Sequence, residues 1–408
     1  MSLHNFKEIE DLEIHCNEQL AGHLRRNKAG SEFEFSESFF EDTSTKGISF
    51  HLNKKNKFYK FNGDSLPAFF AGLLPEGLRL KAITNKIKTS EDDLFSILAA
   101  IGSQCVGDVY AKPVGNTGEK IKGVTKPVSF KDVDFYKLFL DNLEASSLNS
   151  NDEALAGVQE KISASMISFP LNVSKKDKSY ILKLNPKDKL TLVENEFLSL
   201  ALAKKCGLDV NKAKLVIDSN NQKGLLVERF DRYKDTKASD FKMLHQEDGC
   251  QFLNRYPADK YRVSFKEILK GIESYSTAPK IEILKALQLY AFSYLLGNGD
   301  LHAKNISLQT LKPSGRVVLT PCYDLICTYI YQDHKMALKL NGRDDNIKRR
   351  DFIELGHAFS VPEKAVVNML DKLLTLFNKN YAPLMSCMNQ KQQKLWLKVN
   401  NLRSKDLE

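Results

Sequence analysis

The sequence predicts an α+β protein in which a strand-rich segment precedes a mostly helical one, with an extra subdomain in front of both. Apolar runs of strand composition recur between about residues 128 and 245. Apolar residues at helical spacing dominate from about residue 246 onward. With 408 residues the chain is too long for one ordinary core, so we expect two or three subdomains.

The composition is that of a globular protein, with 42% hydrophobic and 27% charged residues. No segment approaches the ~20 apolar residues that a membrane span needs. Met1–Leu20 is charged throughout, so we expect neither a membrane anchor nor a secretory signal. The seven cysteines lack a CxxC pair, which favours reduced thiols in the cytoplasm over a structural zinc site. A solvated basic face explains the net charge of +9, although affinity for a nucleotide or nucleic acid would give the same excess.

The first region, residues 1–125, mixes short alternating segments with helices. Leu66–Leu74 is an apolar run with a proline near each end, and Asp92–Ile101 carries apolar residues at helical spacing. Val106–Ala111 is typical of a strand. The Lys- and Gly-rich stretch Gly115–Pro127 is predicted to be a linker.

The second region, residues 126–245, is rich in strand signals. Ser179–Leu184, Ala213–Ile217 and Gly224–Phe230 are predicted strands. Leu192–Cys206 is a predicted helix between the first two, and Gly207 is its predicted C-cap.

The third region, residues 246–408, is mostly helical. Ile281–Leu296 is apolar on nearly every face toward its end, which indicates a helix buried inside a lobe. It stops at the turn signal Gly297–Gly299, and Val366–Phe377 is a later predicted helix. Strands followed by a helical lobe, with a polar loop after a buried helix, are typical of a two-lobed protein kinase.

The strongest local signal is GNGDLHAKNIS, residues 297–307. It places Asp300 and Asn305 five positions apart, which is the spacing of the catalytic Asp and the metal-binding Asn in a kinase catalytic loop. A carboxylate there can accept or orient the proton of an attacking hydroxyl, while an amide oxygen holds a magnesium ion beside it.

A second carboxylate follows at Asp324. Ile306–Leu308 and Val317–Leu319 are predicted to form a hairpin that returns Asp324 to Asn305, as the Asp of the kinase DFG motif is placed, although the local triplet is Tyr-Asp-Leu. Taken singly, these residues are better explained as turn residues or a helix N-cap. Their order favours catalysis.

Lys183 lies within the predicted strand Ile181–Leu184, where it points either to water or into a site that neutralises phosphates. Glu194 and Glu196 on the next helix are both candidate partners. A weaker signal is the single-glycine turn of Ala156–Lys161, which could bind phosphate but is equally well a plain hairpin.

His302 could act as a general base. Asp300 suits that role better, so His302 is predicted to orient the loop by hydrogen bonding.

Sequence boxes along nearly the whole chain resemble those of the HipA-type bacterial serine/threonine kinases, the toxins of toxin–antitoxin modules. No single box decides this resemblance, but their order is specific. The boxes are Gly72–Glu76, Ile101–Gly102 with Val106–Gly107, Ala156–Lys161, Ile181–Leu184, Val227–Arg232, Gln246–Asp248 with Cys250–Gln251, and Gly299–Asn305 with Tyr323–Asp324.

The resemblance implies a two-lobed protein-kinase-like fold with an extra N-terminal subdomain, using ATP and Mg²⁺. Lys183 would contact ATP phosphates, and Glu228 and Phe230 would lie at the adenine hinge. Asp300 would be the catalytic carboxylate with His302 beside it, and magnesium would bind to Asn305 and Asp324. The other implied nucleotide contacts are Gly157, Gln159, Lys161, Asp231, Gln246 and Lys304.

The resemblance also implies partners. Members of this family phosphorylate cytosolic proteins of translation, notably aminoacyl-tRNA synthetases, and are held by a helix-turn-helix antitoxin that bridges them to operator DNA. We therefore expect a protein substrate, an antitoxin, DNA only through the antitoxin, and no membrane. The family's autophosphorylated serine is replaced here by Ala154, so regulation by phosphorylation at that position is not expected.

Two other functions remain open. Gly299–His302 matches small-molecule kinases of the aminoglycoside or choline type equally well, whereas Gln159–Lys161, Phe230–Arg232 and Gln246–Asp248 fit only the HipA type. A non-catalytic scaffold that binds an antitoxin is the third possibility. It would have no need to retain Lys183 together with the Asp-Asn-Asp set.

Overall fold

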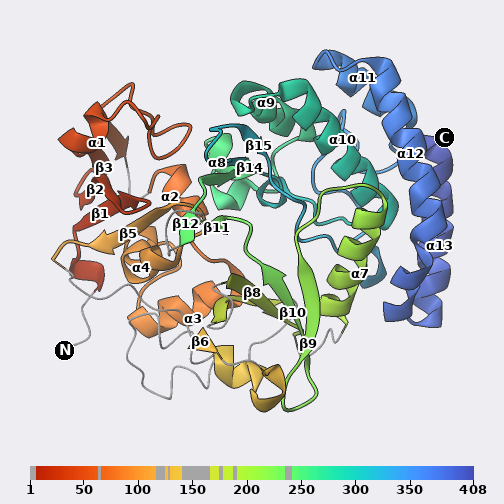
Figure 1. The fold of residues 1–408 in the computed structure, drawn as a ribbon, viewed down its shortest axis with the longest axis horizontal. Helices are drawn as coiled ribbons and strands as arrows, with labels where there is room; N and C mark the ends of the chain where they lie inside the picture. Colours follow the sequence, from red (N-terminus) through yellow and green to blue (C-terminus); the bar gives the residue numbers. More distant parts are fainter. Residues whose placement is uncertain are drawn as a thin grey trace. The chain divides into compact units, whose positions relative to one another are not determined.

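The structure is a computed structural model that describes residues 6–62, 66–115, 125–126, 129–139, 166–173, 178–186, 191–234 and 241–408. The chain forms two compact units. Figure 1 labels their helices and strands. Unit 1 consists of residues up to Leu190 together with Leu215–Gln246. Unit 2 consists of Thr191–Lys214 together with Glu247–Glu408.

The N-terminal part of unit 1 is built on a five-stranded antiparallel sheet in the order β4-β3-β2-β1-β5. Its strands alternate between a buried face, which in β1 carries Leu12 and Ile14, and a partly exposed one. Helix α4 is buried over almost its whole length. The elements are β1 (Asp11–Cys16), β2 (Gln19–Asn27), β3 (Gly30–Phe35), α1 (Glu37–Glu41), β4 (Phe58–Asn62), α2 (Ala68–Gly72), α3 (Gly77–Ile87), α4 (Leu94–Ile101) and β5 (Val109–Pro113).

A second five-stranded sheet, in the order β6-β7-β8-β10-β9, carries Lys183. Strand β8 pairs antiparallel with β7 and β10, and Leu182 and Leu184 on either side of Lys183 are buried. The strands are β6 (Thr125–Lys126), β7 (Ile167–Val173), β8 (Lys178–Leu184), β9 (Ala213–Ile217) and β10 (Lys223–Glu228); β11 (Arg232–Lys234) pairs separately with β12 (Phe241–Met243).

Unit 2 is mostly helical, and α10 is its central element. Every residue of α10 from Leu289 to Leu296 is buried, as the sequence predicts, and α9, α11, α12 and α13 all pack against it. The helices are α7 (Leu192–Lys205), α8 (Gly249–Phe252), α9 (Phe265–Tyr275), α10 (Pro279–Leu296), α11 (Arg349–Ala358), α12 (Glu363–Asn380) and α13 (Gln390–Leu407).

A small sheet in the order β13-β14-β15 follows the loop after α10. Strands β14 (Ser307–Thr310) and β15 (Val317–Leu319) form the predicted antiparallel hairpin, with Leu308 opposite Leu319. Strand β13 (Gln246–Asp248) lies on the other side of β14. The hairpin sends the chain from Asn305 outward and back to Asp324.

Most predicted elements are confirmed within one to three residues. The helix predicted at Leu192–Cys206 is α7, and Gly207 after it has φ +82°. Strand β5 begins three residues later than predicted, because Gly107, at φ +85°, forms a turn first. The region boundaries at 125 and 245 stay predictions. The turn at Ala156–Lys161 and most of the linker at Gly115–Pro127 lie outside the described residues. No described helix is long and apolar enough to cross a bilayer.

Candidate functional site

The loop that carries Asp300 starts where α10 ends, and side chains of α13 fix that end. Trp396 Nε1 donates to Leu296 O at 2.8 Å, Asn400 Nδ2 donates to Leu295 O at 3.0 Å and Arg403 Nη1 donates to Tyr294 O at 2.8 Å. These carbonyls belong to the last helical turn, where acceptors lack the usual donor four residues later. Tyr294 O also accepts from Gly297 N at 3.2 Å. Gly297, at φ +79°, then turns the chain out of the helix.

Hydrogen bonds from outside the loop hold its backbone. Gly299 N donates to Thr328 Oγ1 at 2.7 Å, and Ala337 N donates to Gly299 O at 3.0 Å. Within the loop, Asp300 N donates to Asn298 Oδ1 at 3.1 Å. The loop is therefore tied to the segment that follows Asp324.

Asp300 and Asn305 meet as the spacing predicts. Asn305 Nδ2 donates to the backbone oxygen of Asp300 at 2.9 Å, which orients the amide. No described residue donates a hydrogen bond to Asn305 Oδ1. The Asp300 carboxylate accepts a hydrogen bond from the Tyr261 hydroxyl at 2.8 Å. His302 is buried beneath the Tyr261 ring, with 5.1 Å between ring centroids.

Asp324 stands at the end of the return from the hairpin, with a left-handed backbone at φ +53°. Aspartate tolerates this conformation better than most residues, and such backbone is concentrated at functional sites. The preceding Tyr323 hydroxyl donates to Lys304 O at 2.7 Å. Burial raises the pKa of the Tyr323 phenol well above its ordinary value, and the nearby Asp248 and Asp324 carboxylates raise it further. Asp324 thus lies close to the segment that carries Lys304 and Asn305.

Asn195 fixes the chain just beyond Asp324. The buried Asn195 Nδ2 donates to Cys327 O at 3.1 Å, and Cys327 N donates back to Asn195 Oδ1 at 2.9 Å. Helix α7, which carries Asn195, also packs against α12. A buried side chain thereby satisfies both backbone groups of an irregular segment.

Lys304, a predicted nucleotide contact, forms an ion pair with Asp248 at 2.7 Å. Asp248 also caps α8 by accepting from Gln251 N at 3.0 Å. Both side chains are largely buried. This pairing gives Lys304 a structural partner, and its role toward a nucleotide stays a prediction, as does that of the half-buried Gln246.

The predicted residues of unit 1 lie on its second sheet. Lys183 is 7% exposed on β8, opposite Leu225 of β10. Glu228 ends β10, and Glu228 and Phe230 are half-buried. Glu194 and Glu196 belong to unit 2, so the choice between them as partners of Lys183 remains open. Gly157, Gln159, Lys161 and Ala154 lie outside the described residues.

Asp231 sits in a buried ion-pair cluster. It accepts from Arg229 Nη2 at 2.6 Å, from Arg232 Nη1 at 2.8 Å and from Gly107 N at 2.9 Å. Burial alone would raise the pKa of Asp231, but the two guanidinium groups lower it well below its usual range. Asp231 therefore joins the chain after β10 to the turn before β5. Its predicted nucleotide contact remains untested.

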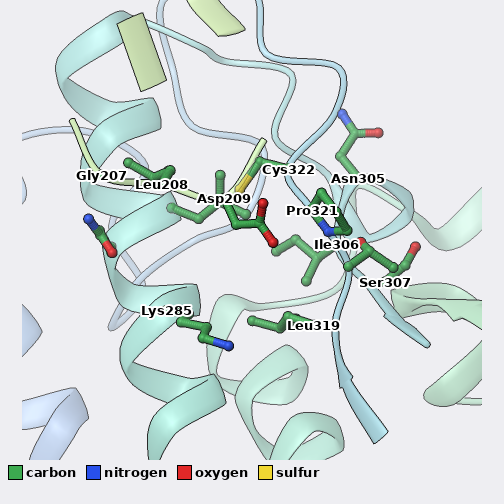
Figure 2. Close-up of a pocket in the computed structure, with 13 residues that line it drawn as sticks. Gly207, Leu208, Asp209, Lys285, Asn305, Ile306, Ser307, Leu319, Pro321 and Cys322 are labelled. Carbon is green, nitrogen blue, oxygen red and sulfur yellow. The ribbon is translucent and has the colours of Figure 1, made fainter. Parts of the chain in front are cut away.

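A cavity of about 140 Å³ lies beside the hairpin in unit 2. Asp209, Lys285 and Leu319 are among its lining residues, and Figure 2 shows the Asn305 amide directed away from the other lining side chains. The cavity and the predicted metal-binding amide thus use different faces of the segment at Asn305.

Sequence reasoning did not assign Tyr261 or the Asp248–Lys304 ion pair. Tyr261 lies 39 positions before Asp300, in a turn without any motif. Gln246–Asp248 was singled out as a box. Its aspartate could have been assigned as a helix cap from Gln251 three residues later.

Two family profiles match the chain. The profile of the HipA-like C-terminal domain covers residues 154–380, and that of the HipA N-terminal domain covers residues 12–112. The chain belongs to the HipA-like kinase family. This confirms the resemblance derived from the order of the sequence boxes.

Individual relatives agree with the family assignment. The putative kinase Y4mE of Sinorhizobium fredii is 28% identical over 350 residues, covering 82% of each chain. The serine/threonine-protein kinase toxin HipA of Shewanella oneidensis is 27% identical over 305 residues, covering 69% of the HipA-like chain and 67% of the toxin.

The fold agrees as well. The solved complex of HipA, HipB and operator DNA from Shewanella oneidensis MR-1 matches with a TM-score of 0.74 and 19% identity, over 97% of each chain. The predicted α+β fold of the HipA kinase type is confirmed.

Proposed function

We propose that the chain transfers the γ-phosphoryl group of ATP to a serine or threonine hydroxyl of a cytosolic protein. The observation that carries the proposal is the grouping in unit 2 of Asp300, Asn305 and Asp324. The first two share one loop and are joined by a hydrogen bond, and the hairpin returns the third beside Lys304. Family membership supports the reaction class.

The residues fit Mg²⁺. Asp324 supplies a carboxylate and Asn305 an amide oxygen that accepts no hydrogen bond from the described residues, and such oxygen ligands, completed by substrate phosphates, are what Mg²⁺ takes. When bound, the ion would neutralise charge on the phosphates. The hydrogen bond from Asn305 Nδ2 to Asp300 O keeps the amide oxygen turned outward.

Asp300 is proposed to hold the acceptor. Its carboxylate accepts the hydrogen bond of the acceptor hydroxyl, orients the oxygen toward the γ-phosphorus and receives the proton as the new bond to phosphorus forms. The bond between the γ-phosphorus and the β–γ bridging oxygen breaks in the same transfer, and ADP leaves with that oxygen. The backbone hydrogen bonds of Gly299 and the bond from Asp300 N to Asn298 Oδ1 hold the loop that carries the carboxylate. His302, buried under Tyr261, supports the loop.

Lys183 is proposed to contact the ATP phosphates, with Glu228 and Phe230 at the adenine. Its place on a buried strand, with 7% of it exposed, suits a cation that contacts a bound anion. Gly157, Gln159, Lys161, Asp231, Gln246 and Lys304 complete the proposed nucleotide set.

The proposed substrate is a component of translation such as an aminoacyl-tRNA synthetase, and the proposed role is that of a growth-arresting toxin in the cytoplasm. The proposed partner is a helix-turn-helix antitoxin, with DNA bound through it. Support comes from the named toxin of Shewanella oneidensis and from its complex with HipB and operator DNA.

Radiolabelled ATP with purified protein and a bacterial lysate tests the proposal. Wild type should label a lysate protein, and Asp300→Asn should keep the fold while lowering transfer at least ~100-fold. Asp324→Asn should instead need far more Mg²⁺ to reach its own maximum. Near wild-type turnover of Asp300→Asn would remove that residue from the centre, and phosphorylation of aminoglycosides or choline in place of proteins would favour the small-molecule alternative.

A further inference from the structure

Tyr261 occupies the position that an acceptor hydroxyl should take. Its hydroxyl donates to Asp300 Oδ1 at 2.8 Å, which is the contact that a substrate hydroxyl must make with the proposed proton acceptor. A hydrogen bond from a neutral hydroxyl to a carboxylate is charge-assisted, so it is stronger than a hydrogen bond between neutral groups. The tyrosine and an acceptor therefore compete for the same carboxylate.

The backbone under Tyr261 is held against the catalytic loop. Ala303 N donates to Lys260 O at 3.1 Å, which links the two segments next to the tyrosine. Successive turns, Lys260 N to Pro257 O at 3.2 Å and Arg262 N to Asp259 O at 2.8 Å, shape the segment itself. The ring of Tyr261 lies edge to face with His302. This hydrogen-bonded turn therefore holds the Tyr261 hydroxyl next to Asp300.

The side chain can nevertheless leave. Tyr261 is 53% exposed, so rotation about its side-chain bonds swings the ring into water without opening a core. The contact is therefore strong enough to occupy Asp300 and loose enough to be displaced.

We propose that Tyr261 is a positioning residue that occupies Asp300 until a protein acceptor displaces it. The inference rests on the proposed function, because it concerns the acceptor position of the same site. A water molecule or a small alcohol offers little beyond one hydrogen bond and competes poorly with a tethered hydroxyl. A protein acceptor brings contacts elsewhere and displaces the tyrosine. Tyr261 thereby disfavours ATP hydrolysis and selects for protein acceptors.

Tyr261→Phe separates the hydroxyl from the ring. It keeps the ring on His302 and removes the donor, and Tyr256→Phe, in the same segment, is the matched control. Hydrolysis of Mg-ATP without acceptor should rise roughly threefold to tenfold in Tyr261→Phe, and the KM for dephosphorylated casein should fall by a similar factor, because the competing state is removed. The kcat for casein should not change, since the acceptor has already displaced the tyrosine in the bound complex.

Three results would overturn the proposal: unchanged hydrolysis and KM, a raised KM with a lowered kcat, or stoichiometric phosphate on Tyr261, which would make it an acceptor. Tyr256→Phe should match wild type in all assays, and an equal response of both variants would also overturn it.

A direct measurement of the contact between Tyr261 and Asp300 distinguishes failure of this proposal from failure of the proposed function. In protein labelled with ¹³C at tyrosine Cζ, the Tyr261 resonance, assigned by its loss in Tyr261→Phe, should shift in Asp300→Asn. An unshifted resonance rejects the contact even if transfer is observed. If wild type neither hydrolyses ATP nor labels any protein, the proposed function fails. The proposed role of Tyr261 then fails with it, even if the resonance shifts.

Discussion

Asp231 is a buried carboxylate whose substitution should be costly. Its carboxylate faces two guanidinium groups, and Arg229 and Asp231 are almost fully buried. Burial and the like charge of Arg229 together lower the pKa of Arg232 to about 10, against the opposing effect of the Asp231 carboxylate. Removing the carboxylate would leave buried cations without their counter-charge, which is more costly than never having had the pair.

Asp231→Asn should therefore destabilise unit 1 by about 3–5 kcal/mol at neutral pH, measured by urea unfolding. The folded pKa of Asp231 is lowered, so its ionisation stabilises the fold above the unfolded value near 3.9 and this contribution is lost as pH falls below that value. The difference between wild type and variant should accordingly shrink below about pH 4. A difference that is constant between pH 7 and pH 3 would contradict this account.

At the same scale, spacing predicted the pairing of Asp300 with Asn305, because five residues in one loop leave few other arrangements. Spacing could not predict Tyr261, because its contact depends on the turn at Pro257–Asp259 packing beside the loop. Asp231 was predicted as a nucleotide contact, and no sequence pattern indicates that Arg229 and Arg232 both pair with it.

Helix α13 shows what an element contributes beyond its own packing. Its buried Trp396, Asn400 and Arg403 donate to the last carbonyls of α10, where the loop that carries Asp300 begins. The apolar pattern of Ile281–Leu296 predicted α10 correctly. It could not reveal α13 as the partner, since a buried arginine and asparagine look like surface residues in sequence.

Arg403→Met tests this coupling. Arg403 is 2% exposed and also donates to His334 O at 2.9 Å and to Asp345 at 3.1 Å. Its loss removes hydrogen bonds that a buried, charged guanidinium makes, so we expect a destabilisation of about 2–4 kcal/mol in thermal or urea unfolding. Lys405 on the same helix is exposed, so the control substitution Lys405→Met should change the free energy of unfolding by less than about 0.5 kcal/mol. Equal effects of the two substitutions would show that α13 does not brace α10 in this way.

At the scale of the whole molecule, the compact units do not follow the order of the chain. Unit 2 takes Thr191–Lys214 from the middle of the sequence, because α7 packs on α12 and Asn195 binds Cys327. Composition along a sequence indicates which secondary structure each segment favours. Packing between distant helices decides which segments share a core. The family could be predicted because its boxes are short local patterns, which can be recognised without knowing how distant segments pack.

The proposed toxin role makes a prediction about living cells. Expression of the chain without a partner protein should stop bacterial growth, because an unrestrained kinase would continue to modify its substrate. Asp300→Asn should be harmless at equal expression, since it keeps the fold and loses the proposed proton acceptor. Colony counts after induction, with protein levels matched by immunoblot, measure the difference. Equal toxicity of the two forms would point to binding in place of catalysis, as expected of a scaffold, and growth unaffected by either form would reject the toxin role while leaving phosphoryl transfer to the labelling experiment.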